Sequence, residues 1–464
     1  MPEIRETHLH QGRQAVKLGL VRVVHDLFPE ERLKTSYSIL EGIFCHLVDS
    51  DLSTREVRRI DEGLRAWVAR DEPIPLIGRE DGYYVYDVDG LVVRTLYPAL
   101  TRPSEVEPFT LAPFSHGFIV DFGDIGKGAD TPLIPPVKLE AAYAERRLWL
   151  SRVGIEVVAD VNNFIRSGRQ LELIGIAEAL HEKKISRIAD SILTQHRALR
   201  ALLIAGPTSS GKTSFLRRLN TQLFVNGFRP VGLSLDNYYL DHDRTPLDAD
   251  GRPDFDVPEA LDLPLLRDHL RRLVEGEPVE VPHFDFVTGA RTTERTTVQV
   301  GPSEILVIEG IHALNPTLVG RINRNQLYKI HVSALGGLNV DLLNRVPTTE
   351  IRLLRRIVRD DRARGTSAEQ TLEQWASVRR GEYRNVFRFQ EDADVMFNSS
   401  MVYELNALRL PGEAALHRIG DDSPFRDTRD RLLNLLTFFD PLDSAKVPFN
   451  SLLREFIGGS IYEP

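Results

Sequence analysis

The fold is decided by the stretch Ala201-Leu-Leu-Ile-Ala-Gly206-Pro-Thr-Ser-Ser-Gly211-Lys212-Thr213-Ser214-Phe215. It opens with a short apolar run that is typical of a buried parallel strand. The pattern G-x-x-x-x-G-K-T follows, and a helical pattern begins at Phe215. A strand, a glycine loop and a helix in this order are the context that a phosphate-binding loop requires. The sequence therefore predicts a nucleotide site at the start of this helix.

The residue types in the loop suit a chain of phosphate groups. Glycines let backbone N–H groups turn toward a phosphate, and the helix N-terminus adds partial positive charge. Lys212 is predicted to reach the β- and γ-phosphates, and the Thr213 hydroxyl to ligate Mg²⁺. We therefore expect ATP and Mg²⁺ as cofactors, with these nucleotide-binding residues in the loop: Gly206, Pro207, Thr208, Ser209, Ser210, Gly211, Lys212, Thr213 and Ser214.

Composition limits the class of protein. A chain of 464 residues predicts two or three domains, and 42% hydrophobic residues can fill their cores. The net charge of -9 argues against a general nucleic-acid binder. The single cysteine, Cys45, excludes an internal disulfide and fits a reducing compartment. With no signal-peptide pattern and no apolar run of membrane-span length, we expect a cytoplasmic protein, and we leave homo-oligomerisation open.

The chain divides by pattern into an α+β part and an α/β part. Before the loop, Ser53-Thr-Arg-Glu56 predicts a capping box that starts a helix, and residues 83–97 predict a hairpin. After the loop, strand and helix patterns alternate as in a doubly wound parallel sheet. The predicted division is an α+β domain at 1–170, a connecting helix at 171–199, an α/β phosphate-loop domain at 200–410 and a C-terminal helical extension at 411–464.

Acidic residues directly follow two of the predicted strands, and a basic helix follows later. Ligands bind at the carboxyl ends of the strands in such sheets. Asp236 is placed there to accept a proton from an attacking hydroxyl, and Glu309 is in the Walker-B position for Mg²⁺. The arginines of 352–364 are interpreted as a lid that screens phosphate charge.

Residues 200–400 resemble the uridine kinase and phosphoribulokinase family. The matching motifs are the loop, Asp236-Asn-Tyr-Tyr239, the stretch 255–262, Phe284-Asp-Phe286, Glu309-Gly-Ile, and the arginine helix with Arg364 and Gln374. The resemblance implies transfer of the ATP γ-phosphoryl group to a small-molecule hydroxyl, with a nucleoside as the leading acceptor. It implies catalytic roles for Asp236, Lys212 and Arg359, a nucleotide contact at Arg364, metal ligation by Thr213 and Glu309, and substrate contacts from Tyr239, Asp256, Phe284, Phe286, Arg291, Arg356 and Gln374.

Two departures from that family keep alternatives open. The family's base-contacting histidine falls at Gly289, and one lid arginine falls at Thr366. A site without a polar base contact discriminates less between acceptors. A kinase of another sugar or polyol therefore remains an alternative, as does a regulatory or RNA-associated phosphate-loop ATPase.

Residues 13–165 resemble the second additional domain of threonyl-tRNA synthetases. The similar stretches are 24–29, 36–47 and 52–64. The His-x-x-x-His pair and the later Cys-x-x-x-His of the editing site do not occur, so we predict neither metal binding nor editing there. The tail Val447–Ser460 resembles the C-terminal signature of a bacterial two-part family in which such a domain precedes a uridine-kinase-like domain.

Overall fold

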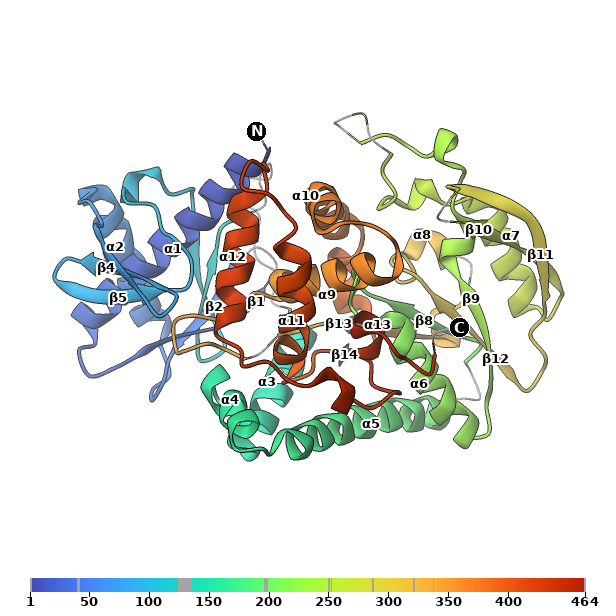
Figure 1. The fold of residues 1–464 in the computed structure, drawn as a ribbon. Coiled ribbons are helices and arrows are strands. Elements are labelled where there is room, and N and C mark those ends of the chain that lie inside the picture. Colours follow the sequence, from blue (N-terminus) through green and yellow to red (C-terminus); the bar gives the residue numbers. More distant parts are fainter. Residues whose placement is uncertain are drawn as a thin grey trace. The chain divides into compact units, whose positions relative to one another are not determined.

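Two units make up the chain. In this computed structural model, the first unit is Met1–Gln170, Gly336–Ile351 and Leu405–Leu442, and the second is Leu171–Leu335, Arg352–Glu404 and Asp443–Pro464. Each unit is assembled from three separate stretches of chain (Figure 1). The structure describes residues 2–39, 42–123, 136–195, 199–248, 251, 253–285, 288–319, 322–336 and 338–462.

A five-stranded parallel sheet forms the centre of the second unit. Its order is β14-β13-β8-β12-β9, so the strand that leads into the phosphate loop lies in the middle. All residues of this middle strand are buried, as expected for a parallel strand covered on both faces. The predicted α/β fold is thereby confirmed, with strands β8 (Ala201–Ala205), β9 (Arg229–Ser234), β12 (Glu304–Glu309), β13 (Leu327–Ser333) and β14 (Val395–Asn398).

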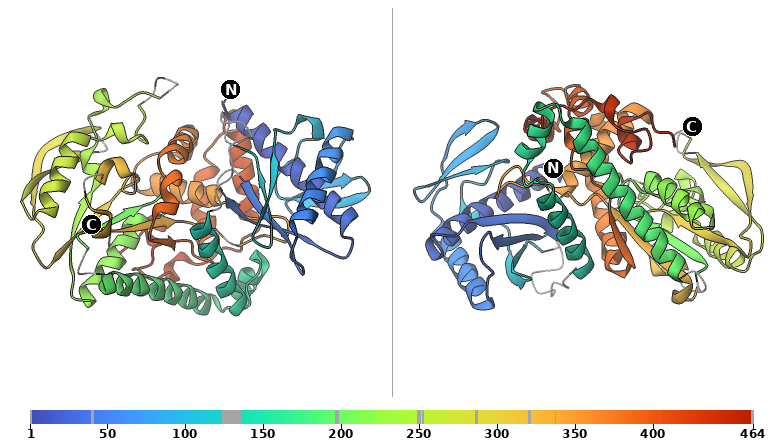
Figure 2. Two further views of the ribbon diagram at one scale, coloured as in Figure 1. Left: turned by 180° about the vertical axis from the view of Figure 1, so that it is seen from behind. Right: turned by 90° about the horizontal axis from the view of Figure 1, so that it is seen from below.

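Helices and a hairpin complete the second unit. The long helix α5 packs along α6, and Arg218 of α6 forms ion pairs with Glu178 and Glu182 of α5 (Figure 2). A two-stranded antiparallel hairpin, β10-β11, stands apart from the main sheet. The elements are α5 (Gln170–Gln195), α6 (Lys212–Val225), α7 (Leu263–Val274), β10 (Val279–Asp285), β11 (Ala290–Val298), α8 (Pro316–Val319), the larger part of α9 (Thr348–Ala363), α10 (Ala368–Asn385) and α13 (Arg454–Ile457).

The first unit is a mixture of antiparallel sheets and helices. A four-stranded sheet has the order β1-β2-β7-β6, and a three-stranded sheet has the order β3-β4-β5. The predicted capping box is confirmed, since Glu56 N donates to Ser53 Oγ at 3.3 Å and Ser53 N donates to Glu56 Oε2 at 2.8 Å. The predicted hairpin is confirmed as β4-β5. The elements are α1 (Pro2–Leu27), β1 (Leu33–Ile39), β2 (Gly42–Leu47), α2 (Thr54–Arg70), β3 (Leu76–Glu80), β4 (Tyr83–Val88), β5 (Leu91–Thr95), β6 (Thr110–Phe114), β7 (Gly117–Asp121), α3 (Val137–Arg152), α4 (Val158–Arg166), most of α11 (Glu404–Leu416) and α12 (Arg426–Thr437).

Membrane-spanning character is absent from the described helices. None of the helices in these ranges is both long and apolar enough to cross a bilayer.

Candidate functional site

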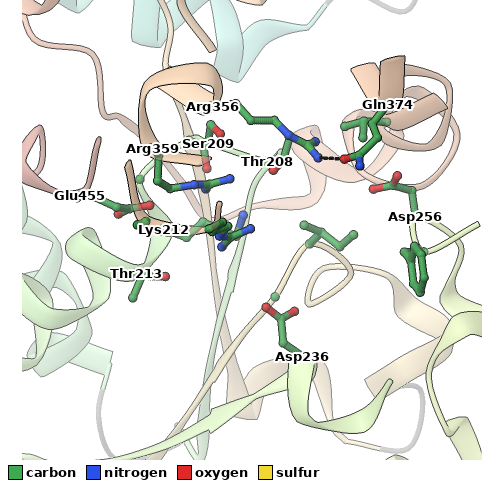
Figure 3. Close-up of a pocket in the computed structure, with 18 of the residues that line it drawn as sticks. Thr208, Ser209, Lys212, Thr213, Asp236, Asp256, Arg356, Arg359, Gln374 and Glu455 are labelled. Carbon is green, nitrogen blue, oxygen red and sulfur yellow. Dashed lines mark hydrogen bonds between the residues drawn. The ribbon is translucent and has the colours of Figure 1, made fainter. Parts of the chain in front are cut away.

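A cavity of about 640 Å³ opens at the carboxyl ends of β8, β9 and β12, within the second unit. Figure 3 shows Lys212, Asp236, Asp256, Arg356 and Arg359 around it. The structure brings most of the predicted site residues to this one cavity. They are Thr208, Ser209, Ser210, Gly211, Lys212, Thr213, Asp236, Tyr239, Asp256, Glu309, Arg356, Arg359, Arg364 and Gln374.

The phosphate loop packs closely against the neighbouring strand. A Cβ atom on Gly206 would lie 1.9 Å from the carbonyl oxygen of Val332 in β13, so a larger residue does not fit there. Ser209 adopts a φ of 55°, a left-handed conformation that is uncommon outside glycine. The loop is therefore held in one shape that leaves its backbone N–H groups at the start of α6.

Two buried ion pairs hold the backbone of the loop at Thr208 and Ser209. Glu382 accepts from Thr208 N at 2.7 Å and pairs with Arg352, whose Nε donates to Thr208 O at 3.1 Å. Arg355 pairs with Glu404, with 2.8 Å between Nε and Oε2, and its Nη1 donates to Ser209 O at 3.3 Å.

The interpretation of the basic helix as a lid is therefore wrong for two of its arginines. Arg352 and Arg355 are almost fully buried and donate to carbonyl oxygens of the loop. Their charge serves the shape of the loop. The arginines that line the cavity are Arg356, Arg359, Arg362 and Arg364.

Three of these lining arginines converge on one buried acid. Asp360 is 3% exposed and lies 3.2 Å from Arg356, 2.7 Å from Arg359 and 3.6 Å from Arg364. Arg356 also donates to Gln374 Oε1 at 2.8 Å, as drawn in Figure 3. A single carboxylate thus orients three cations toward the cavity, and the sequence analysis assigned it no role.

Lys212 faces the carboxyl groups of Asp236 and Glu309. Its Nζ donates to the carbonyl oxygens of Gly206 at 2.8 Å and Pro207 at 3.0 Å. Burial lowers the pKa of Lys212, and the neighbouring acids oppose that effect. Burial raises the pKa of Asp236, which makes it a stronger base than a solvated aspartate.

Glu309 and Thr213 fit a magnesium ion. Burial and the charge of Asp236 raise the pKa of Glu309 to about 7. Its Oε2 atom is buried and has no hydrogen-bond partner among the described residues. A buried carboxylate oxygen without a partner is costly unless a cation or water satisfies it. Thr213 lines the same cavity and can supply a hydroxyl oxygen, the ligand type that Mg²⁺ prefers.

Two predicted substrate residues, Arg291 and Phe284, are not among the residues that line the cavity. Arg291 donates to Tyr239 O at 2.9 Å and to Tyr238 O at 2.8 Å, and it pairs with Asp262 at 3.0 Å. It therefore fixes the backbone that carries Tyr239. Phe284 is buried with its ring centroid 5.7 Å from that of Tyr239, and Phe286 lies outside the described residues.

Some cavity residues escaped the sequence analysis. The cavity is also lined by Phe255, Glu373 and Glu455, to which the sequence analysis gave no role. Phe255 could have been found as the aromatic residue next to Asp256. Glu455 gave no signal, because it lies in a tail without a recognised chemical motif. Among the predicted loop residues, Gly206, Pro207 and Ser214 lie beside the cavity lining rather than in it.

The stability of the protein is expected to fall as pH rises toward 8. Burial, with Glu382 and Asp254 nearby, raises the pKa of Asp256 to about 8. A carboxyl group with a raised folded-state pKa stabilises the fold fully below its unfolded pKa, and this contribution is lost as pH rises through the folded value. The melting temperature without nucleotide should therefore decline from about pH 5 to about pH 9.

Replacement of Asp256 should reduce that decline. The Asp256→Asn side chain cannot ionise. The melting temperature of this variant should therefore rise relative to that of wild type as pH increases. The exposed Glu294→Gln on β11 is the control and should follow wild type. If the difference in melting temperature between wild type and Asp256→Asn stays constant with pH, the raised pKa of Asp256 is contradicted.

Known proteins match the phosphate-loop half of the chain. The family model described as phosphoribulokinase / uridine kinase family matches residues 202–405. The uridine kinase of Deinococcus deserti is 32% identical over 172 residues, which is 37% of this chain and 73% of that protein. The uridine kinase of Halobacterium salinarum is 32% identical over 178 residues, covering 38% and 70% of the two chains.

A third relative and one solved structure match a similar share of the chain. The uridine kinase of Staphylococcus carnosus is 33% identical over 176 residues, covering 38% of this chain and 74% of its own. The structure of a possible uridine kinase from Bacillus stearothermophilus is 19% identical with a TM-score of 0.30, covering 46% and 97%. At that level the structural similarity adds no weight to the sequence matches.

Proposed function

Because the chain belongs to the phosphoribulokinase / uridine kinase family, we propose that it transfers the γ-phosphoryl group of ATP to a hydroxyl group of a nucleoside. One observation carries the proposal. The phosphate loop, the half-buried acid Asp236 and the lid arginines Arg359 and Arg364 line a single cavity. These are the parts that phosphoryl transfer to an alcohol needs: a phosphate cradle, a base and cations.

The chemistry is mainly positioning and electrostatics, since the transition state of phosphoryl transfer is loose. Asp236 takes the proton of the acceptor hydroxyl, and its raised pKa improves it as a base. Lys212, Arg359 and Arg364 stabilise the charge on the transferred group. Thr213 and Glu309 would hold Mg²⁺, which neutralises phosphate charge when bound.

The acceptor is proposed to bind on the side of Asp256. Asp256, Tyr239, Arg356 and Gln374 line that part of the cavity, and we assign them contacts to the acceptor. The predicted contacts of Phe284, Phe286 and Arg291 remain proposals, and the geometry of Arg291 favours an indirect role through Tyr239.

The position of Gly289 bears on acceptor identity. A Cβ atom there would lie 2.3 Å from the ring of His242, so the His242 imidazole fills the space beside it. The centroid of the His242 ring lies 4.9 Å from that of Phe255, and Phe255 lines the cavity. A histidine thus remains near the place where the family resemblance puts its base contact. If it makes no such contact, the second candidate, a kinase of another sugar or polyol, is favoured.

The rest of the chain is assigned by resemblance. We propose that residues 1–170 form a synthetase-like domain without metal or editing activity and that 171–199 connect it to the kinase domain. The bounds predicted from sequence, 200–410 for the kinase domain and 411–464 for its extension, differ from the two units of the structure. Gly336–Ile351 and Leu405–Leu442 belong to the same unit as residues 1–170. A cytoplasmic location is proposed with them, and homo-oligomerisation stays open. A role for the synthetase-like part in binding RNA is the remaining alternative.

The test is an acceptor panel. ADP release from ATP and Mg²⁺ is measured with nucleosides, sugars and polyols, one at a time, with Asp236→Asn as the blank. Stimulation by uridine or cytidine is the expected result. Stimulation by a sugar or polyol alone would move the assignment to the second candidate. Release that no acceptor stimulates would contradict a small-molecule kinase and favour the regulatory ATPase.

A further inference from the structure

The C-terminal segment 443–462 belongs to the second unit but lies beyond the family match at 202–405. It packs directly against the phosphate loop. A Cβ atom on Gly211 would lie 2.5 Å from Leu452, so the loop glycine and this leucine are in close contact. The ring of Phe456 lies 4.8 Å from the guanidinium of the buried Arg355. The segment is therefore part of the structure behind the nucleotide cavity.

The turn that carries Glu455 is held by its own hydrogen bonds. Arg454 is 7% exposed, and its guanidinium donates to the carbonyl oxygens of Val447 at 3.2 Å, Gly458 at 3.0 Å and Ser444 at 3.0 Å. The lid residue Arg362 donates to Phe456 O at 3.4 Å. Because the guanidinium of Arg454 binds carbonyl oxygens before and after Glu455, it holds the turn that places Glu455 beside α6.

Glu455 reaches the first turn of α6. Its Oε2 atom accepts from Ser214 N at 3.2 Å and from Ser214 Oγ at 2.8 Å. It lines the cavity with Lys212 and Thr213, and Figure 3 shows the Glu455 side chain next to α6. In a phosphate loop, the N–H groups at the start of the helix are the donors that bind the phosphates of the nucleotide.

A carboxylate and a phosphate cannot use the same donors. Glu455 accepts from the Ser214 N–H group that a phosphate at the start of α6 would use. Two like charges a few ångströms apart in a partly desolvated cavity repel strongly. Lys212 adds a second observation, since its Nζ donates to the carbonyl oxygens of its own loop at Gly206 and Pro207. The ammonium group of Lys212 and the donors of Ser214 are thus satisfied by other groups of the same chain.

We propose that Glu455 occupies the phosphate-binding donors of Ser214 and must leave them when a nucleoside triphosphate or diphosphate binds. The C-terminal segment then sets the nucleotide affinity of the site. This inference rests on the nucleotide-binding part of the proposed function and is independent of the acceptor.

The test compares binding of MgADP, inorganic tripolyphosphate and adenosine to wild type and Glu455→Gln by calorimetry. Glutamine keeps the shape and removes the charge, so the dissociation constants for both phosphate ligands should fall about fivefold or more. Adenosine binding should not change. The exposed Glu294→Gln should behave as wild type with all three ligands.

A second readout follows the segment itself. Hydrogen exchange at 451–458 should increase when MgADP binds to wild type, because Glu455 releases Ser214. Weaker or unchanged phosphate binding by Glu455→Gln would overturn the proposal and assign Glu455 a supporting role in the loop. If Glu455→Gln binds the phosphate ligands more tightly than wild type but phosphorylates no acceptor, this inference is upheld and the proposed kinase function is contradicted.

Discussion

Replacement of Asp236 by asparagine is expected to lower kcat by about 10²–10⁴-fold while ATP affinity stays within about twofold of wild type. Asp236 follows β9, is half-buried and lines the same cavity as Lys212. Asparagine has nearly the same shape but cannot take a proton from the acceptor hydroxyl. The substitution should therefore slow the chemical step and leave nucleotide binding unchanged.

The measurement is steady-state kinetics with the best acceptor of the panel, alongside calorimetry with MgADP. Asp243→Asn is the matched control, because Asp243 is an exposed acid in the segment that follows Asp236. It should retain wild-type kcat. Turnover by Asp236→Asn within a few-fold of wild type would remove Asp236 from the role of base.

Replacement of Arg355 by methionine is expected to destabilise the second unit by about 3–5 kcal/mol. The Arg355 and Glu404 side chains are 0% and 3% exposed. Methionine would leave the Glu404 charge buried without its partner, and the carbonyl oxygens of Ser209 and Ser399 would each lose a donor. Removal of one partner costs far more than the net value of the pair.

Thermal and denaturant unfolding of the variant test this prediction. Arg271→Met removes an exposed pair with Glu275 and should leave stability unchanged. If Arg355→Met does not fold, the double variant Arg355→Met with Glu404→Gln should recover soluble protein, because no buried charge then lacks a partner. Equal stability of Arg355→Met and Arg271→Met would contradict the account of the loop support.

Features encoded in short stretches of sequence were predictable. The phosphate loop could be recognised because its glycines, lysine and threonine all lie within eight neighbouring residues. The acids Asp236 and Glu309 could be placed because parallel strands end at one edge of a sheet. The same holds for the capping box of Ser53 and Glu56, whose partners are three residues apart.

Features that depend on distant partners were not predictable. Arg352 and Arg355 belong to the same basic helix as Arg359, and only their burial against Glu382 and Glu404 gives them a different role. Those partners lie 30 and 49 residues further along the chain.

The contact of Glu455 with Ser214 spans 241 residues. No periodicity or motif records such a pair, because it is produced by the packing of the C-terminal segment against the loop. Its place in the cavity became visible only in the folded chain.

The most direct test of the central claim is identification of the product. Phosphorus NMR follows the reaction of wild type with ATP, Mg²⁺ and uridine, beside Asp236→Asn. The account predicts a new phosphomonoester resonance, coupled to the 5′-methylene protons of the nucleoside, that appears as ADP forms with wild type alone. ADP accompanied only by inorganic phosphate, with no phosphorylated nucleoside, would contradict it.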